Sequence, residues 1–372
     1  MSKTVRLNSF EVAAVNLVLF ILVSTIILNT GANALNSSKS LLMDDRLTKA
    51  YQYILSRYNP TLGLVSESED KGINAVEGTT VDNTYWIYSD NLWAAEALQP
   101  YNLDIAENIS RAVQSYIAKY GKSMLFEAAL GEVIPTTIHA GKNIVALNVT
   151  VNGKWVQILL DRHQYVDNPE GIFNDSDEYA DLCFYMTIDY WMLNDTHASE
   201  HWFRAGETLW NDSTNKGFYD KAAKSYKPQP LYQNMKLGLF LLAQRATGFR
   251  SNITSVVEAA AWSYQIKNGG IASLSYMNGT VYGTANIETT SALLLSYNDK
   301  LIERLRIQKS NCETKSQECE DRIDQLQTEI EPLKEQVTNL RLVFIVLGVA
   351  TVILATISMV LLIRSAKARH SR

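Results

Sequence analysis

Apolar residues recur every three to four positions along most of the middle of the chain, which is the spacing of an amphipathic helix. This spacing predicts eight helices, over residues 41–57, 84–98, 103–120, 177–193, 196–210, 230–247, 252–267 and 284–298. Apolar and polar residues alternate instead over Asn143–Arg162, where Asn152-Gly153 is the preferred turn of a two-residue β-hairpin. Gly131–His139 is predicted to add a strand, so a β insertion is expected over about 131–166.

A glycine followed by an apolar residue lies between successive predicted helices at four places. These are Gly63-Leu64, Gly171-Ile172, Gly217-Phe218 and Gly270-Ile271. Helix, glycine loop and helix in repetition predict antiparallel helical hairpins that pack side by side, as a toroid or a solenoid. We therefore expect residues 35–298 to form a mainly α head of about four hairpins, with the β-hairpin inserted in the second.

Three groups of motifs in this head resemble structural turns of the six-hairpin, α/α-toroid proteins related to glycosidases. They are Leu209-Trp210-Asn211-Asp212 with Gly217-Phe218-Tyr219-Asp220, Gln265 with Asn268-Gly269-Gly270 and Asn286-Ile287-Glu288-Thr289-Thr290, and Tyr85-Trp86 with Ser89-Asp90-Asn91. The resemblance implies an α/α-hairpin toroid, incomplete because four hairpins are fewer than six, and a function on carbohydrates. The motifs are turns, so no catalytic residue follows from them.

The N-terminus has the three parts of a secretory signal peptide. Lys3 and Arg6 precede an apolar run over Val12–Leu28, and Ala32-Asn33-Ala34 matches a cleavage site. The pattern predicts a signal peptide over residues 1–34 that is cleaved after Ala34. The alternative is an uncleaved signal anchor, because the run is only slightly shorter than a bilayer core is thick.

The C-terminus carries a second long apolar run. Leu342–Ile363 contains 22 residues without a charge, and as a helix it would be about 33 Å long, enough to cross a bilayer. The basic tail over residues 364–372 predicts a cytoplasmic C-terminus. The sequence therefore predicts a single-pass protein of the cell membrane whose head is extracytoplasmic.

Between the head and this run, residues 299–340 fit a heptad repeat. The a positions are Ile302, Lys309, Ser316, Ile323, Ile330 and Val337, and the d positions are Leu305, Cys312, Cys319, Leu326, Leu333 and Leu340. β-Branched residues at a with leucine at d favour a parallel dimer. A coiled-coil stalk and a parallel homodimer are therefore predicted; the alternative is a single amphipathic helix folded onto the head.

Cysteine is scarce, with three residues in the chain. Cys312 and Cys319 share the d face of the predicted helix, about 10 Å apart, which is too far for a disulfide between them. Interchain disulfides are predicted across the dimer axis, and a local Cys312–Cys319 loop is the alternative. Cys183 lies on an apolar helical stripe and is expected to be a buried core thiol.

The formal net charge of −5 is unevenly distributed. Residues 1–34 carry +1 and the basic tail carries +4, so the segment between them carries −10. This acidity argues against nucleic acids and other polyanions and permits neutral glycans. The same segment holds eight N-x-S/T sequons, which predict a glycosylated surface protein. They are Asn36, Asn108, Asn148, Asn174, Asn194, Asn211, Asn252 and Asn278.

Carboxyl and aromatic side chains gather near the predicted starts of inner helices. Sugar hydrolysis needs one protonated carboxyl and one carboxylate. The candidate catalytic residues are Asp90, Asp177, Glu178 and Glu288. The candidate substrate-binding residues are Trp86, Tyr88, Asn91, Asp82, Gln233 and Asn234. Asp90 stands out because an apolar helix surrounds it, where a carboxylate is costly unless it is paired or faces water. The alternatives are helix-capping acids and core aromatic residues.

His197-Ala198-Ser199-Glu200-His201 matches H-x-x-E-H, in which two histidines bind zinc and the glutamate is the base. Glu258 or Glu288 could supply a third ligand. The sequons Asn194 and Asn211 flank this helix, which favours an exposed outer helix. We therefore expect no metal and no cofactor, with His197 and His201 as the fallback ligands.

The leading functional hypothesis is a head that binds or processes extracytoplasmic glycans. As an enzyme it would be a glycoside hydrolase or would resemble a polysaccharide lyase. The sequence leaves two alternatives, a non-catalytic module for adhesion or envelope architecture and a zinc-dependent hydrolase.

Overall fold

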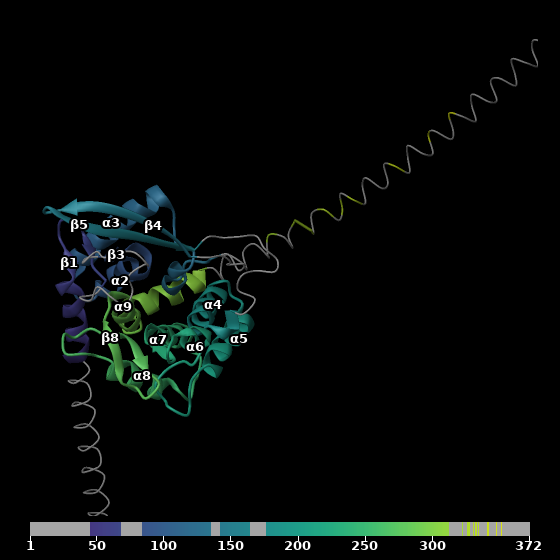
Figure 1. The fold of residues 1–372 in the computed structure, drawn as a ribbon. Coiled ribbons are helices and arrows are strands. Elements are labelled where there is room, and N and C mark those ends of the chain that lie inside the picture. The colour runs from purple at the N-terminus through teal and green to yellow at the C-terminus, as the bar shows by residue number, and fades with distance from the viewer. Residues whose placement is uncertain are drawn as a thin grey trace, which may run out of the picture. The chain divides into compact units, whose positions relative to one another are not determined.

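The computed structural model describes residues 45–67, 84–134, 142–163 and 176–311, together with nine single helical positions between 322 and 351 (Figure 1). The predicted signal peptide, Cys312, Cys319 and most of the predicted transmembrane run lie outside these residues. The chain divides into two compact units, residues 1–309 and residues 310–372. The fold and the sites described below belong to the first unit.

Helices form most of this unit, because its apolar residues recur with helical spacing. The helices are residues 45–56, α2 (Trp93–Leu98), α3 (Leu103–Tyr120), α4 (Ala180–Met192), α5 (Thr196–Thr208), α6 (Lys221–Ser225), α7 (Met235–Thr247), α8 (Thr254–Ser263), α9 (Ile287–Leu295) and residues 299–311. Each of the eight predicted helices overlaps a helix of the structure. Asn102, Asp195 and Asn286 cap α3, α5 and α9 with their side chains.

Eight strands form three small sheets. The strands are β1 (Tyr58–Asn59), β2 (Leu64–Val65), β3 (Thr84–Trp86), β4 (Lys142–Val151), β5 (Lys154–His163), β6 (Leu231–Gln233), β7 (Ala272–Tyr276) and β8 (Val281–Ala285). They pair in the orders β1-β2, β3-β5-β4 and β6-β7-β8. The predicted hairpin is confirmed: β4 and β5 pair from end to end, and both turn residues, Asn152 and Gly153, have positive φ.

The predicted fold class, a mainly α toroid with one β-hairpin that precedes a coiled-coil stalk and a transmembrane helix, is wrong for the head. The described residues combine helices with three sheets. The β6-β7-β8 sheet was not predicted, although β7 alternates apolar and polar residues and Asn278-Gly279 lies in the turn between β7 and β8. None of the helices in the described part of the chain is both long and apolar enough to cross a membrane.

The centre of the unit is a set of packed helices. Helix α4 contacts α5 and α7, and α7 contacts α9, which in turn contacts α2; α4 and α5 lie side by side in Figure 1. Gly238 allows α7 and α9 to approach closely, because a Cβ atom there would lie 2.5 Å from the backbone of Ala292 and Leu293. This packing fixes the positions of α4, α7 and α9, which carry the polar side chains described below.

The first turns of the predicted stalk pack on the head itself. Leu301, Ile302 and Leu305 of the 299–311 helix are buried in the hydrophobic core. Arg304 forms a bidentate ion pair with Glu96 of α2, with N–O distances of 2.8 and 3.2 Å. Two of the predicted heptad positions, Ile302 and Leu305, are therefore occupied by intrachain packing. A coiled coil remains predicted only for the heptads beyond residue 311.

Candidate functional site

The candidate site begins at a single turn of π-helix, η1 (Ile87–Leu92), between β3 and α2. The Asn91 amide holds this turn in place: its Oδ1 accepts from the Val65 backbone N–H at 2.7 Å, and its Nδ2 donates to the carbonyls of Val65 and Trp86. π-Helical turns are rare and often lie at functional sites. Here the turn places the Asp90 side chain inside the unit.

Asp90 is only 1% exposed. One of its carboxyl oxygens accepts from the Ser89 hydroxyl at 3.3 Å, and the other, Oδ2, has no hydrogen-bond partner among the described residues. Burial raises the pKa of Asp90 well above its ordinary value, and the nearby charges of Glu67, Glu288 and Asp161 raise it further. Asp90 therefore holds a proton under conditions in which an exposed aspartate is ionised. Glu67, Asp90, Asp161 and Glu288 are called the carboxyl cluster below.

Different elements position the other members of the carboxyl cluster. Glu67 accepts a 2.6 Å hydrogen bond from the Trp86 indole. Asp161, on β5, accepts from the backbone N–H groups of Tyr88 and Ser89, at the start of η1. Glu288 lies in the first turn of α9 and is partly exposed. Glu288 is thus the member of the cluster that reaches the surface.

A buried ion pair network lies beside this cluster. Lys236 of α7 is 1% exposed, and its ammonium group contacts Asp220 and lies 3.2 Å from Oδ1 of Asp181. Burial alone would lower the pKa of Lys236, but the charges of Asp181 and Asp220 outweigh it and the pKa is raised. Asp220 is fully buried, whereas Asp181, in the first turn of α4, is partly exposed. Lys236, Asp181 and Asp220 are called the lysine network below.

The two groups of charges meet at Tyr185 of α4. Its buried hydroxyl has no hydrogen-bond partner among the residues that the structure describes. Burial raises the pKa of Tyr185 well above its ordinary value, and Asp181, Glu288 and Asp161 raise it further. Tyr185 is therefore close to Glu288 and Asp161 of the carboxyl cluster and to Asp181 of the lysine network. We call the carboxyl cluster, the lysine network and Tyr185 together the central polar site.

Tyr226 and Gln233 lie at the partly exposed edge of the central polar site. The Gln233 amide donates a 3.1 Å hydrogen bond to the Tyr226 hydroxyl. Burial raises the pKa of Tyr226, and among the charges that act on it are those of Lys236 and Glu288. A phenol, an amide and two carboxyl groups that are all partly exposed can form hydrogen bonds with the hydroxyl groups of a sugar.

Several predicted binding residues are structural instead. Trp86, Tyr88, Asn91 and Asn234 are buried. The Tyr88 hydroxyl donates to the carbonyl of Gly121, and the Asn234 amide donates to a β7 carbonyl at 2.9 Å and accepts from the Ser275 hydroxyl. Of the predicted residues, the central polar site includes Asp90 and Glu288, with Gln233 at its edge.

Two other predicted acids are at the surface. Asp177 and Glu178 lie on an exposed 3₁₀ turn, η3 (Ser176–Glu178), and Glu178 is 3.5 Å from Lys221. Asp82 lies outside the described residues. The sequence did not lead us to five residues of the site, which are Glu67, Asp161, Tyr185, Asp220 and Lys236. Lys236 was detectable, because it is a charge at the start of an otherwise apolar helical run and a buried charge requires partners.

The histidine motif lies on the outer surface of α5. His197, Glu200 and His201 are exposed, and Glu200 forms a 2.9 Å ion pair with Arg204. Glu258, one of the proposed third ligands, accepts from Arg245 at 2.8 Å. Within the described ranges, no group of three or more His, Cys, Asp or Glu side chains could hold a metal ion. Cys183 is buried, in agreement with its prediction as a core thiol.

Six of the eight sequons fall on described residues. The asparagines that are exposed are Asn148, Asn194, Asn252 and Asn278. Asn108 is half-buried on α3. The Asn211 side chain is engaged in the fold, since its amide donates to the Tyr232 hydroxyl at 2.8 Å. Asn36 and Asn174 lie outside the described residues. Glycosylation itself stays a prediction. Its most accessible acceptors among the described residues are Asn148, Asn194, Asn252 and Asn278.

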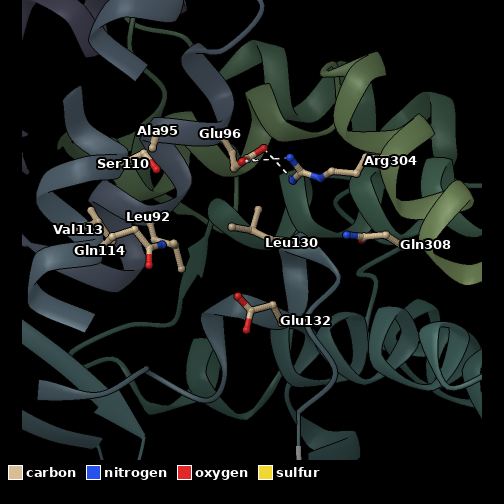
Figure 2. A pocket seen from close by; sticks show the side chains of 10 residues that line it. All are labelled: Leu92, Ala95, Glu96, Ser110, Val113, Gln114, Leu130, Glu132, Arg304 and Gln308. Carbon is tan, nitrogen blue, oxygen red and sulfur yellow. Dashed lines mark hydrogen bonds and ion pairs between the residues drawn. The ribbon is translucent and has the colours of Figure 1, made fainter. Parts of the chain in front are cut away.

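Two surface cavities lie away from the central polar site. One, of about 290 Å³, is bordered by α2, α3 and the 299–311 helix, with the Glu96–Arg304 ion pair at its side (Figure 2). The other, of about 450 Å³, is lined by Tyr276 and the sequon residue Asn278, among others. No predicted catalytic or substrate-binding residue lines either cavity.

A third buried carboxyl predicts how stability depends on pH. Burial raises the pKa of Asp189 to about 6, although a 2.7 Å hydrogen bond from the Ile134 backbone N–H opposes the shift. The folded state binds this proton more tightly than the unfolded chain, so the stabilisation is present at low pH and is lost as the pH rises through 6. We expect this group to make the free energy of unfolding about 1 kcal/mol larger at pH 5 than at pH 7.5.

Urea unfolding of the wild type and of Asp189→Asn at both pH values measures this contribution. The variant should show a smaller pH dependence by about the same 1 kcal/mol, whereas Glu107→Gln, a change at an exposed acid of α3, should match the wild type. Equal pH dependence in the wild type and Asp189→Asn would show that Asp189 is not perturbed.

Comparison of the chain with protein-family models, with curated proteins and with solved structures found no match.

Proposed function

We propose that the head binds glycans outside the cytoplasm and hydrolyses them at the central polar site. The observation that carries the proposal is the contrast between two carboxyl groups of the central polar site. Asp90 is a carboxyl group that retains its proton beside Glu288. Asp181 is a carboxylate in an ion pair with Lys236. A carboxyl group that retains its proton and a carboxylate paired with an ammonium group can serve as the acid and the base of one site.

Glycoside hydrolysis uses these two states directly. An acid donates a proton to the oxygen of the bond that breaks, while a base takes a proton from the water that forms the new C–O bond. Asp90 holds the proton at rest. Glu288, the partly exposed member of the carboxyl cluster, is a carboxylate at rest, and we assign it the relay of this proton from Asp90 to the oxygen of the bond that breaks. Asp181 is assigned the role of the base. Exchange with solvent restores both groups.

The surroundings of the head are part of the proposal. The sequence predicts membrane attachment, a surface location and N-glycans, and these predictions favour a site outside the cytoplasm. It also predicts a parallel homodimer. The acidic segment between the two basic ends agrees with a ligand that is not a polyanion.

Glu288→Gln tests the assignment. The full-length protein is incubated with a panel of neutral, amino and acidic polysaccharides, and new reducing ends are counted. We expect cleavage of at least one glycan, and a loss of about 10²–10⁴-fold in kcat/KM for Glu288→Gln, which is the usual contribution of a general acid. Asp181→Asn should be similarly impaired, because it removes the base.

Glu107→Gln on α3 is the matched control and should keep wild-type activity. Full activity in Glu288→Gln would contradict the assigned role. Binding of glycans with no cleavage of any of them would reject hydrolysis and favour the adhesion alternative. The absence of both binding and cleavage would reject a function on glycans altogether.

A further inference from the structure

We infer that the central polar site takes glycans without acid groups and binds most tightly those that carry free amino groups. This inference rests on the proposed function, and it names the class of substrate. The notable property of the site is its charge, which is carried by side chains from seven parts of the fold.

Negative charge dominates the site. Its ionisable carboxyl groups are Glu67, Asp90, Asp161, Glu288, Asp181 and Asp220. Even with Asp90 protonated, five carboxylates stand against the single ammonium group of Lys236. That ammonium group is 1% exposed and is already held by Asp181 and Asp220. It is therefore neutralised within the fold and is not available to an anionic ligand.

Two buried polar groups lie among these carboxyl groups without a hydrogen-bond partner in the described part of the chain. The Oδ2 atom of Asp90 and the hydroxyl of Tyr185 have no hydrogen-bond partner among the described residues, and each side chain is at most 1% exposed. Both lie among the carboxyl groups, because Glu288 and Asp161 act on each of them. An ammonium group of a ligand at Glu288 would gain attraction from several carboxylates and a hydrogen-bond acceptor in the site.

The same geometry argues against acidic polysaccharides. A carboxylate on the sugar would face like charges in a site of reduced solvent exposure, where repulsion is stronger than in water. A lyase acting on an acidic sugar would have to neutralise that carboxylate, and the site provides no unengaged cation to do so. Within the proposed function, this favours hydrolysis over the lyase-like alternative.

The test uses three hexasaccharides and the full-length protein. They are a chitosan hexamer with free amines, its fully N-acetylated form, and hexagalacturonate. Calorimetry at low salt should show the amino form binding about tenfold more tightly than the acetylated form, with no binding of hexagalacturonate. The preference should shrink at high salt, because screening weakens the attraction. Glu288→Gln should reduce the preference, and Glu107→Gln should not.

The outcomes separate this inference from the proposed function. Hexagalacturonate binding as tight as that of the acetylated form overturns the inference and leaves glycan hydrolysis standing. A tenfold preference that persists in Glu288→Gln overturns the inference, because it shows general attraction to an acidic surface. If none of the three binds while the polysaccharide panel is cleaved, the inference alone fails. If none binds and nothing is cleaved, both fail.

Discussion

Leu305→Ala is expected to lower the free energy of unfolding by about 2–5 kcal/mol. Leu305 is fully buried in the core of the head, although the sequence assigns it to the stalk. Truncation would leave a cavity against Gly131, since even a Cβ atom on this glycine would lie 2.2 Å from Leu305 Cδ2. Ile307 lies on the same helix but is 53% exposed, so Ile307→Ala should change stability by less than about 0.5 kcal/mol.

Urea unfolding of the two variants measures this difference. A companion experiment shortens the chain, because the head predicted from sequence ends at residue 298. A chain that ends there loses the burial of Leu301, Ile302 and Leu305, about 1.5–3 kcal/mol each, which is comparable with the whole stability of many domains. It should be unfolded or nearly so, whereas a chain ending at residue 311 should unfold cooperatively. Equal stability of the two alanine variants would show that the helix does not belong to the head.

Lys236→Met should destabilise the protein by about 3–5 kcal/mol, because it leaves a buried carboxylate without its counter-charge. Asp220 is fully buried and contacts the ammonium group directly. Its remaining hydrogen bonds come from the backbone N–H groups of Ala180 and Ala223, at 3.1 and 2.8 Å. Neither of these donors carries a full positive charge. The loss should appear as a lower urea midpoint with an unchanged slope.

Two further variants isolate the charge effect. Lys236→Met combined with Asp220→Asn should recover part of the lost stability, because it removes the unpaired charge and keeps a side chain that can accept at least one of the backbone hydrogen bonds. Lys221→Met removes a half-exposed lysine that is 3.5 Å from Glu178, and it should cost less than about 1 kcal/mol. If Lys236→Met were as stable as Lys221→Met, the buried network would not exist in solution.

The helices were predictable because their signal is local. Apolar spacing located all eight, and Asn152-Gly153 located the β4–β5 hairpin. The β7–β8 hairpin carries a similar local signal, the alternation in β7 and the Asn278-Gly279 turn, which the sequence analysis did not use. The pairing of β6 was not predictable, since β6 has only three residues and is distant from β7 in the sequence. The resemblance to α/α-toroid proteins rested on turn motifs, and turns recur in folds that differ in their sheets.

The site was predictable only in part, for a physical reason. Asp90 could be singled out because an apolar helix surrounds it, and Glu288 because it starts a helix. Their relation to Lys236 and Tyr185 depends on how α4, α7 and α9 pack, which no local pattern encodes. Asn91 and Asn234 were wrongly predicted to bind substrate, because their amide groups form hydrogen bonds with the backbone of neighbouring segments.

The protonation state of Asp90 is the most direct test of the acid–base site. Its side-chain carboxyl ¹³C signal can be followed against pH in the full-length protein labelled in aspartate, with Asp90→Asn to assign the resonance. The structure predicts that Asp90 titrates well above pH 4 and remains protonated where the exposed aspartates are ionised. Titration of Asp90 near pH 4, together with the exposed aspartates, would contradict the account.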